Sequence, residues 1–219
     1  MTRFHDHHFP GESDEYRHAR DELLAAEIEL RRQVEKVAEQ RRALPAGGVV
    51  PEDYVFEGPD GPAKLSSLFM SGQDCLVLYS FMFPPGKEPC PMCTSVLDGV
   101  NGSAPHISQR VSLAVIAKAP LLEIQTYAKG RDWNNLRLYS AGSSTYSRDY
   151  LGENKEGAQM PMLNVFARRK DDIVHTYATE LMLAKAEPGQ DPRHVDMIWP
   201  LWNMLDFTPD GRGDWYPQR

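Results

Sequence analysis

The feature that most constrains this chain is an apolar run at residues 75–82 that ends shortly before a pair of cysteines. The run reads Cys-Leu-Val-Leu-Tyr-Ser-Phe-Met, as expected for a central strand that is covered on both faces. A proline-rich loop follows it, and Cys90 and Cys93 come where the next helix should begin. A strand, a loop and a helix with two cysteines in its first turn therefore define the centre of the predicted fold.

Strands and helices alternate on both sides of this centre. We expect strands at 54–56, 111–118, 136–139, 162–166 and 173–179, helices at 65–69, 94–110, 121–129 and 197–205, and turns at 58–61 and 169–172. A strand, a helix and a second strand, followed by a hairpin and a closing helix, predict an α/β domain with a mixed sheet. We assign this domain to residues 49–219.

The first 44 residues have a different character. Residues 1–13 are polar and carry three of the seven histidines, and we expect them to form a mobile tail. Residues 14–44 contain no glycine or proline and begin with two acidic residues, which predicts one long N-terminal helix. Four apolar residues form a narrow stripe on this helix: Leu23, Leu30, Val34 and Val37. The stripe packs along an edge of the domain or, alternatively, against a second copy as a homodimer arm.

Charge and hydrophobicity exclude several classes of function. The chain has 31 acidic and 24 basic residues and a net charge of −7, which is the wrong sign for a protein whose main partner is nucleic acid. No stretch approaches the ~18 apolar residues that would span a membrane, and the N-terminus lacks the apolar segment of a secretory signal. With three cysteines, we expect a cytoplasmic protein in which a close cysteine pair is catalytic or metal-binding.

The position of the cysteine pair points to thiol–disulfide exchange. At a helix start, unpaired backbone N–H groups and the positive end of the helix dipole favour a thiolate, so we expect Cys90 to be the nucleophile. Cys93 follows within the first turn, within disulfide reach, and would resolve a mixed disulfide on Cys90. Cys75 lies in the buried strand and is expected to be a core residue.

Pro161 is the second element of the expected site, because it opens the predicted strand 162–166. Opposite a cysteine pair, on this arrangement of elements, such a proline is often cis, and we expect Pro161 to be cis and to lie beside the two sulfurs. The backbone of Met160 would then be available to bind an extended substrate.

Together these features resemble the thioredoxin fold, and more specifically a bacterial family labelled predicted dithiol–disulfide oxidoreductases. The matching segments are 24–44, 53–59, 90–93, 161–166, 174–177 and 205–212. The resemblance covers almost everything after residue 20. It implies a thioredoxin-like mixed sheet flanked by helices with an N-terminal helical extension, and an oxidoreductase that acts on a protein or small-molecule thiol or disulfide.

Two departures from related families limit what carries over. Thioredoxins have a buried acid on the strand that leads to the pair, whereas here the strand ends in apolar residues and Asp74 lies at its far end. Peroxiredoxins place a proline and a threonine before their cysteine where this chain has Phe83 and Lys87, so peroxide reduction of that type is disfavoured. The sequence Gly-x-Gly-x-x-Gly is absent, so we expect no flavin or nicotinamide cofactor and a partner thiol system as electron donor.

Two alternative functions use the same residues differently. Cys90 and Cys93 could bind zinc or copper together with a histidine, for which the candidates are His106, His175 and His194. No second close pair of cysteines or histidines supplies the remaining ligands. In the other alternative the cysteines are incidental, and the fold serves as a docking module through its N-terminal helix and its aromatic C-terminal segment.

Overall fold

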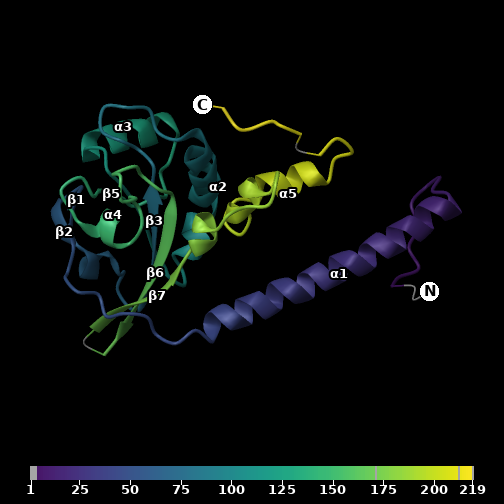
Figure 1. The fold of residues 1–219 in the computed structure, drawn as a ribbon, viewed down its shortest axis with the longest axis horizontal. Coiled ribbons are helices and arrows are strands. Elements are labelled where there is room, and N and C mark those ends of the chain that lie inside the picture. The colour runs from purple at the N-terminus through teal and green to yellow at the C-terminus, as the bar shows by residue number, and fades with distance from the viewer. Residues whose placement is uncertain (1–3, 171, 212, 219) are drawn as a thin grey trace. The chain divides into compact units, whose positions relative to one another are not determined.

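A long N-terminal helix and an α/β domain built on one sheet are the two parts of the structure (Figure 1). The computed structural model describes residues 4–170, 172–211 and 213–218. The chain divides into two units, Met1–Pro45 and Ala46–Arg219. Some residues with sequence-based expectations lie outside the described residues: 1–3 of the expected tail, 171 of the expected turn, 212 of the matching C-terminal segment and 219 at the end of the expected domain.

The first unit contains helix α1 (Asp14–Arg42), which ends two residues before the predicted boundary. The Ser13 hydroxyl caps it by accepting a hydrogen bond from the Tyr16 N–H at 3.1 Å. Two acidic residues in the first turn and two arginines in the last turn complement the helix dipole. Leu23, Leu30 and Val34 of the apolar stripe are exposed.

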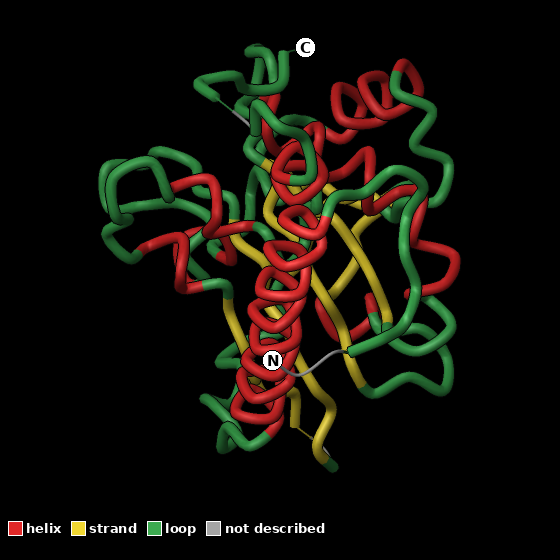
Figure 2. The backbone as a smooth tube through the Cα atoms, turned by 90° about the vertical axis from the view of Figure 1, so that its right-hand side faces the viewer, coloured by secondary structure: helices red, strands yellow, loops and turns green. Residues whose placement is uncertain are grey.

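The second unit is built on a twisted sheet, drawn in yellow in Figure 2. Within the described residues its strands are β1 (Val55–Gly58), β2 (Gly61–Lys64), β3 (Cys75–Phe81), β4 (Ser112–Ala117), β5 (Leu138–Ser140), β6 (Met162–Arg169) and β7 (Asp172–Ala178). They lie in the order β2-β1-β5-β4-β3-β6-β7. Strands β3, β4 and β5 are parallel to one another, whereas β6 is antiparallel to both β3 and β7.

The order of elements around β3 is that of the thioredoxin fold. Helix α2 (Pro91–Ile107) connects β3 to β4, and helix α3 (Leu121–Gly130) follows β4. The β6–β7 hairpin then lies on the other side of β3, and helix α5 (Leu201–Asp206) comes last. The predicted α/β fold with a thioredoxin-like mixed sheet and an N-terminal helix is therefore confirmed.

Several short elements complete the second unit. They are helix α4 (Tyr146–Asp149) and three 3₁₀ segments, Leu65–Leu68, Glu180–Leu183 and Asp191–Val195. Helix α5 begins at Leu201 rather than at the predicted residue 197. The reason is Pro200, which lacks an N–H and fits only at the start of a helix, so the preceding residues take another conformation.

The central position of β3 explains why its sequence is almost wholly apolar. Leu76 and Leu78 point to the core that contains the first 3₁₀ segment and α4, whereas Tyr79 and Phe81 point to the core that contains α2, α3 and α5. Successive residues of a strand point to opposite faces of a sheet. Because a core covers each face of β3, both sets of side chains are buried. This alternation decides which residues of β3 can meet the cysteine pair on α2.

His175 on β7 connects the start of the second unit to the sheet. Its N–H donates to the Gly48 carbonyl at 3.0 Å and its own carbonyl accepts from the Gly47 N–H at 2.9 Å. Its Nε2 lies 2.9 Å from Oδ1 of Asn164, and the ring packs against Tyr150. Burial is the main cause that lowers the pKa of His175 below its ordinary value.

This lowered pKa makes the folded state sensitive to acid. The unfolded chain binds a proton at this histidine below about pH 6.5, while the folded chain keeps it neutral, so stability falls as the pH drops through this range. We expect His175→Gln, which can still donate to Asn164, to show a smaller loss of unfolding free energy between pH 7 and pH 5.5. Urea unfolding of both proteins at the two pH values measures this, and an identical pH dependence would contradict it.

Candidate functional site

The cysteine pair lies at the junction between the loop after β3 and the first turn of α2. Cys90 directly precedes the helix, and Pro91 occupies its first position, where a missing N–H leaves no hydrogen bond unmade. The Cys90 N–H donates to the Met82 carbonyl at 2.9 Å, and its carbonyl accepts from the Thr94 N–H at 3.0 Å. Cys90 is partly exposed, whereas Cys93 is only 3% exposed. The pair therefore presents one accessible sulfur and one buried sulfur.

A chain of hydrogen bonds joins both thiols to β3. The Cys93 thiol is hydrogen-bonded to Cys90, and the Tyr79 hydroxyl and the Met82 backbone N–H are hydrogen-bonded to the Cys93 sulfur. Burial raises the pKa of Tyr79, so its phenol keeps its proton and acts as a donor. The backbone of Met82 thus bonds both cysteines: its carbonyl accepts from the Cys90 N–H, and its N–H donates to the Cys93 sulfur.

These contacts make the two thiols chemically different. The hydrogen bond to Cys90, burial, and the negative charge of a Cys90 thiolate all raise the pKa of Cys93. The hydrogen bonds from Tyr79 and Met82 lower it, but they do not outweigh the other causes. Cys93 therefore holds its proton, and it donates that proton in a hydrogen bond toward Cys90.

The stabilisation of Cys90 by the helix start differs from the sequence-based expectation. The Cys90 side chain forms no capping hydrogen bond with the N–H groups of the first turn of α2. The contribution of the helix start to a thiolate at this position is therefore that of its dipole, without a capping hydrogen bond.

Thr94 and Tyr127 hold the backbone of Cys90 in place. The Thr94 hydroxyl donates to the Cys90 carbonyl at 3.0 Å. Because that hydroxyl proton is used, the Tyr127 hydroxyl, 3.0 Å from the Thr94 oxygen, is the donor of the second bond. This connects the position of Cys90 to helix α3.

An open groove of about 770 Å³ borders the loop that leads to Cys90. Phe83 and residues 86–89 of this loop contribute its walls, together with the first two turns of α3, which include Tyr127. Lys87, Glu88 and Glu123 add charges of both signs. The lining of the groove extends to Pro89, the residue directly before Cys90.

The prediction that Pro161 is preceded by a cis peptide bond is wrong, since the described residues contain no cis peptide. The residues before it fold back on themselves, with Glu153 bridged to Gln159, and the chain then enters β6. No tight turn is needed there, so the ordinary trans form is retained. The N–H of Met160 donates to the Gly152 carbonyl at 3.0 Å, so this part of its backbone is already bonded within the chain.

The strand register gives the position of Met160 and Pro161 relative to the cysteines. Met162 at the start of β6 is paired with Ser80 on β3, so Pro161 lies at the end of the sheet where β3 leads into Met82. This is the end at which Met82 contacts both cysteines.

The histidines proposed as metal ligands are not gathered around the pair. His106 is exposed in the last turn of α2, His175 is bonded to Asn164 in the sheet, and His194 lies in a 3₁₀ segment. Among the residues that the structure describes, no group of three or more histidine, cysteine, aspartate and glutamate residues could hold a metal ion. The described residues therefore do not assemble the zinc or copper site considered above.

Tyr79 and Met82 are the site residues that the sequence analysis missed. The alternation of side chains along a strand could have indicated Tyr79, because residues 79 and 81 point to the face of β3 opposite to that of Leu78. Tyr79 is the hydroxyl-bearing residue of that face, so its position on the strand before the pair could have identified it. The contact of the Met82 backbone depends on the path of the loop and had no signal in the sequence.

The fold and the thiol pair define a thioredoxin-fold protein with two cysteines at the start of a helix. Residues 6–218 match the family described as "Bacterial protein of unknown function (DUF899)", and the chain belongs to this family. No curated protein matches the sequence. Within the described residues, no helix combines the length and the apolar character needed to cross a membrane.

Solved structures with a similar fold include redox proteins. Thioredoxin peroxidase I of Plasmodium yoelii is 16% identical with a TM-score of 0.47, over 80% of this chain and 100% of that one. The bacterioferritin comigratory protein of Xanthomonas campestris is 14% identical with a TM-score of 0.43, over 61% and 86%. The exposed lipoprotein thioredoxin of Streptococcus pneumoniae is 16% identical with a TM-score of 0.39, over 63% and 90%. At these low identities the chemistry has to follow from this chain's own residues.

Proposed function

We propose that the protein is a dithiol–disulfide oxidoreductase in which Cys90 is the nucleophile and Cys93 the resolving thiol. The observation that supports this most is the asymmetry of the pair. Cys90 is partly exposed at a helix start, whereas Cys93 is buried and its proton is held by the hydrogen bond to Cys90. A nucleophilic thiol must be accessible to the substrate, and a resolving thiol must lie next to the nucleophile and remain reduced until the mixed disulfide has formed.

In the first step the Cys90 thiolate attacks one sulfur of a substrate disulfide. A bond forms between Cys90 and that sulfur, the substrate disulfide breaks, and the second substrate sulfur leaves as a thiolate that takes a proton from water. The product is a mixed disulfide on Cys90 with Cys93 still reduced.

Formation of the mixed disulfide prepares Cys93 for the second step. Once Cys90 is in a disulfide it carries no negative charge, so the charge and the thiolate hydrogen bond that raise the pKa of Cys93 are lost. The hydrogen bonds from Tyr79 and Met82 to the Cys93 sulfur still favour its thiolate.

Cys93 gives its proton to water, and its thiolate attacks the Cys90 sulfur. This forms the Cys90–Cys93 disulfide and expels the remaining substrate sulfur as a thiolate that takes a proton from water. The two electrons gained by the substrate have come from the pair, and a partner thiol system returns them. The same steps in reverse oxidise a substrate dithiol.

The substrate is proposed to lie across the exposed side of Cys90. The groove beside residues 83–89 borders one side, and Met160 and Pro161 lie at the same end of the sheet. The substrate class is a protein or small-molecule thiol or disulfide in the cytoplasm, and no bound cofactor takes part.

The proposed mechanism is tested by trapping its intermediate in the variant Cys93→Ser. After reaction with oxidised glutathione, we expect one glutathione on Cys90, because the resolving thiol is absent. Mass spectrometry of the intact protein and of its peptides identifies the adduct, and the double variant Cys90→Ser, Cys93→Ser is the matched control. Modification of Cys75 alone, or equal modification of the control, would refute the assignment of Cys90.

Tyr79→Phe is expected to slow the resolving step about tenfold or more, because hydrogen bonds to a charged group contribute roughly 1.5–3 kcal/mol. The variant removes the donor that favours the Cys93 thiolate. The lifetime of the mixed disulfide, measured by acid quenching and mass spectrometry, reports this step. Tyr146→Phe is the matched control, since Tyr146 is also buried but lies in the core on the other face of the sheet. An equal effect of both substitutions would show that Tyr79 acts only through packing.

A further inference from the structure

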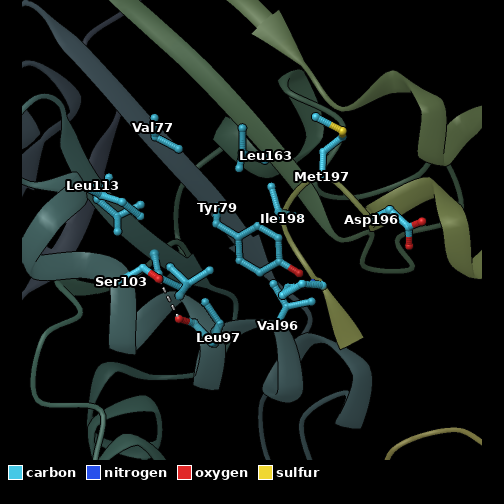
Figure 3. Close-up of a pocket in the computed structure, with 15 residues that line it drawn as sticks. Val77, Tyr79, Val96, Leu97, Ser103, Leu113, Leu163, Asp196, Met197 and Ile198 are labelled. Carbon is cyan, nitrogen blue, oxygen red and sulfur yellow. Dashed lines mark hydrogen bonds between the residues drawn. The ribbon is translucent and has the colours of Figure 1, made fainter. Parts of the chain in front are cut away.

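We propose that a partly open cavity next to the thiol pair is a binding site for a neutral, apolar small molecule. The cavity has a volume of about 460 Å³ and lies between β3, β4, β6, helix α2 and residues 196–200 (Figure 3). All of these elements belong to the second unit. The site is separate from the groove beside Cys90.

The size and lining of the cavity determine what it can hold. Its walls are mostly aliphatic side chains from the sheet, from α2 and from the C-terminal segment, among them Val77, Leu97, Leu163 and Ile198. Apolar walls bind apolar molecules, as an apolar cavity of ~150 Å³ that binds benzene illustrates. A volume of about 460 Å³ is within the range of ~300–1,000 Å³ that is typical of small-molecule sites.

Three polar side chains of the lining make hydrogen bonds within the protein. Oδ2 of Asp196 accepts from Arg193 at 3.0 Å, and the Ser103 hydroxyl donates to the Gly99 carbonyl at 3.3 Å, a bond drawn in Figure 3. The Tyr79 hydroxyl is bonded to Cys93. An anionic ligand would face the Asp196 carboxylate, and a charged ligand of either sign would lose its hydration against walls that are mostly aliphatic. The lining therefore favours a neutral molecule.

The position of the cavity separates its ligand from the disulfide substrate. The described residues that line it include Tyr79, whose ring stands in the wall, but neither Cys90 nor Cys93. A bound molecule would therefore touch the residue that supports Cys93 without reaching the nucleophilic sulfur. The inference does not rest on the proposed thiol chemistry.

Substitution of Gly99 can test whether a molecule binds in the cavity. It lines the cavity from α2 and is exposed, and a Cβ added there would meet no atom within 4 Å. Gly102, one turn further along the same helix, has equally open space but is not among the lining residues. Both glycines lie in a helix that accepts a side chain. Gly99→Leu therefore puts a large side chain at the lining of the cavity, and Gly102→Leu, outside the lining, is its matched control.

The test is a fluorescence titration of the full-length protein with N-phenyl-1-naphthylamine, a neutral apolar probe. We expect saturable binding of one probe molecule per chain, weakened at least tenfold by Gly99→Leu and unchanged by Gly102→Leu. Circular dichroism shows whether both variants are folded. The variant Cys90→Ser is expected to bind the probe as the unmodified protein does, which separates this site from the thiol chemistry.

Three outcomes would overturn the proposal. The first is an absence of saturable binding to the unmodified protein. The second is equal weakening by both leucine variants, which would place the probe elsewhere on the surface. The third is loss of binding in Cys90→Ser, which would place it at the thiol pair.

Discussion

Cys90→Ser is expected to lower disulfide reduction with dithiothreitol as electron donor by about a thousandfold or more. A serine hydroxyl does not ionise at neutral pH and cannot form the mixed disulfide, so the first step is lost. The rate of reduction of a protein disulfide at fixed dithiothreitol, corrected for the uncatalysed reaction, measures the effect. Cys75→Ser removes a thiol from β3 that plays no part in the proposed mechanism, and its activity should remain within about twofold of the unmodified protein.

The comparison of these two variants distinguishes the nucleophile from other thiols. Activity that survives in Cys90→Ser would exclude the proposed mechanism. Activity lost equally in Cys75→Ser would point to a general effect of removing a thiol or to damage to the fold. Circular dichroism of both variants distinguishes these two cases.

Trp202→Ala is expected to lower the free energy of unfolding by about 3–5 kcal/mol, the range for large aromatic residues in a core. Trp202 is fully buried. Its ring lies 4.9 Å from that of Trp199 and 5.5 Å from that of Tyr216, measured between centroids. It thereby attaches the segment after β7 to the core beneath α2. Urea unfolding followed by circular dichroism measures the change.

Phe207→Ala is the matched control for this prediction, because Phe207 lies one residue after α5 and its side chain is 78% exposed. We expect a change of less than about 0.5 kcal/mol. If both substitutions had the same small effect, the C-terminal segment would contribute little to the stability of the core.

The fold around β3 could be predicted because its sequence pattern is unambiguous. The apolar run, the loop and the start of α2 follow from residues 75–93, and the β6–β7 hairpin follows from two strand patterns. Strand β2 could not be predicted, since Gly61 and Pro62 are typical of a turn. The structure accommodates them because β2 is an edge strand, where a proline leaves no hydrogen bond to a neighbour unmade.

The candidate site was only partly predictable. The spacing of Cys90 and Cys93 and their place before a helix are local features, so the sequence indicated them. The contact of Tyr79 with Cys93 depends on which face of β3 is covered by α2, which packing decides. The trans form of Pro161 depends on the fold of the preceding ten residues, so a motif at one position could not predict it.

The proton held on Cys93 couples electron exchange to the acidity of the surroundings. Closing the Cys90–Cys93 disulfide releases that one proton, and opening it takes one proton up. A substrate whose two thiols are both protonated takes up two protons when its disulfide is reduced, so the complete exchange consumes one proton. By mass action, acidic surroundings therefore favour the oxidised protein and the reduced substrate, and alkaline surroundings favour the reverse. A chain that works by the proposed mechanism would shift its exchange equilibrium with the pH of the compartment, without any additional titratable side chain.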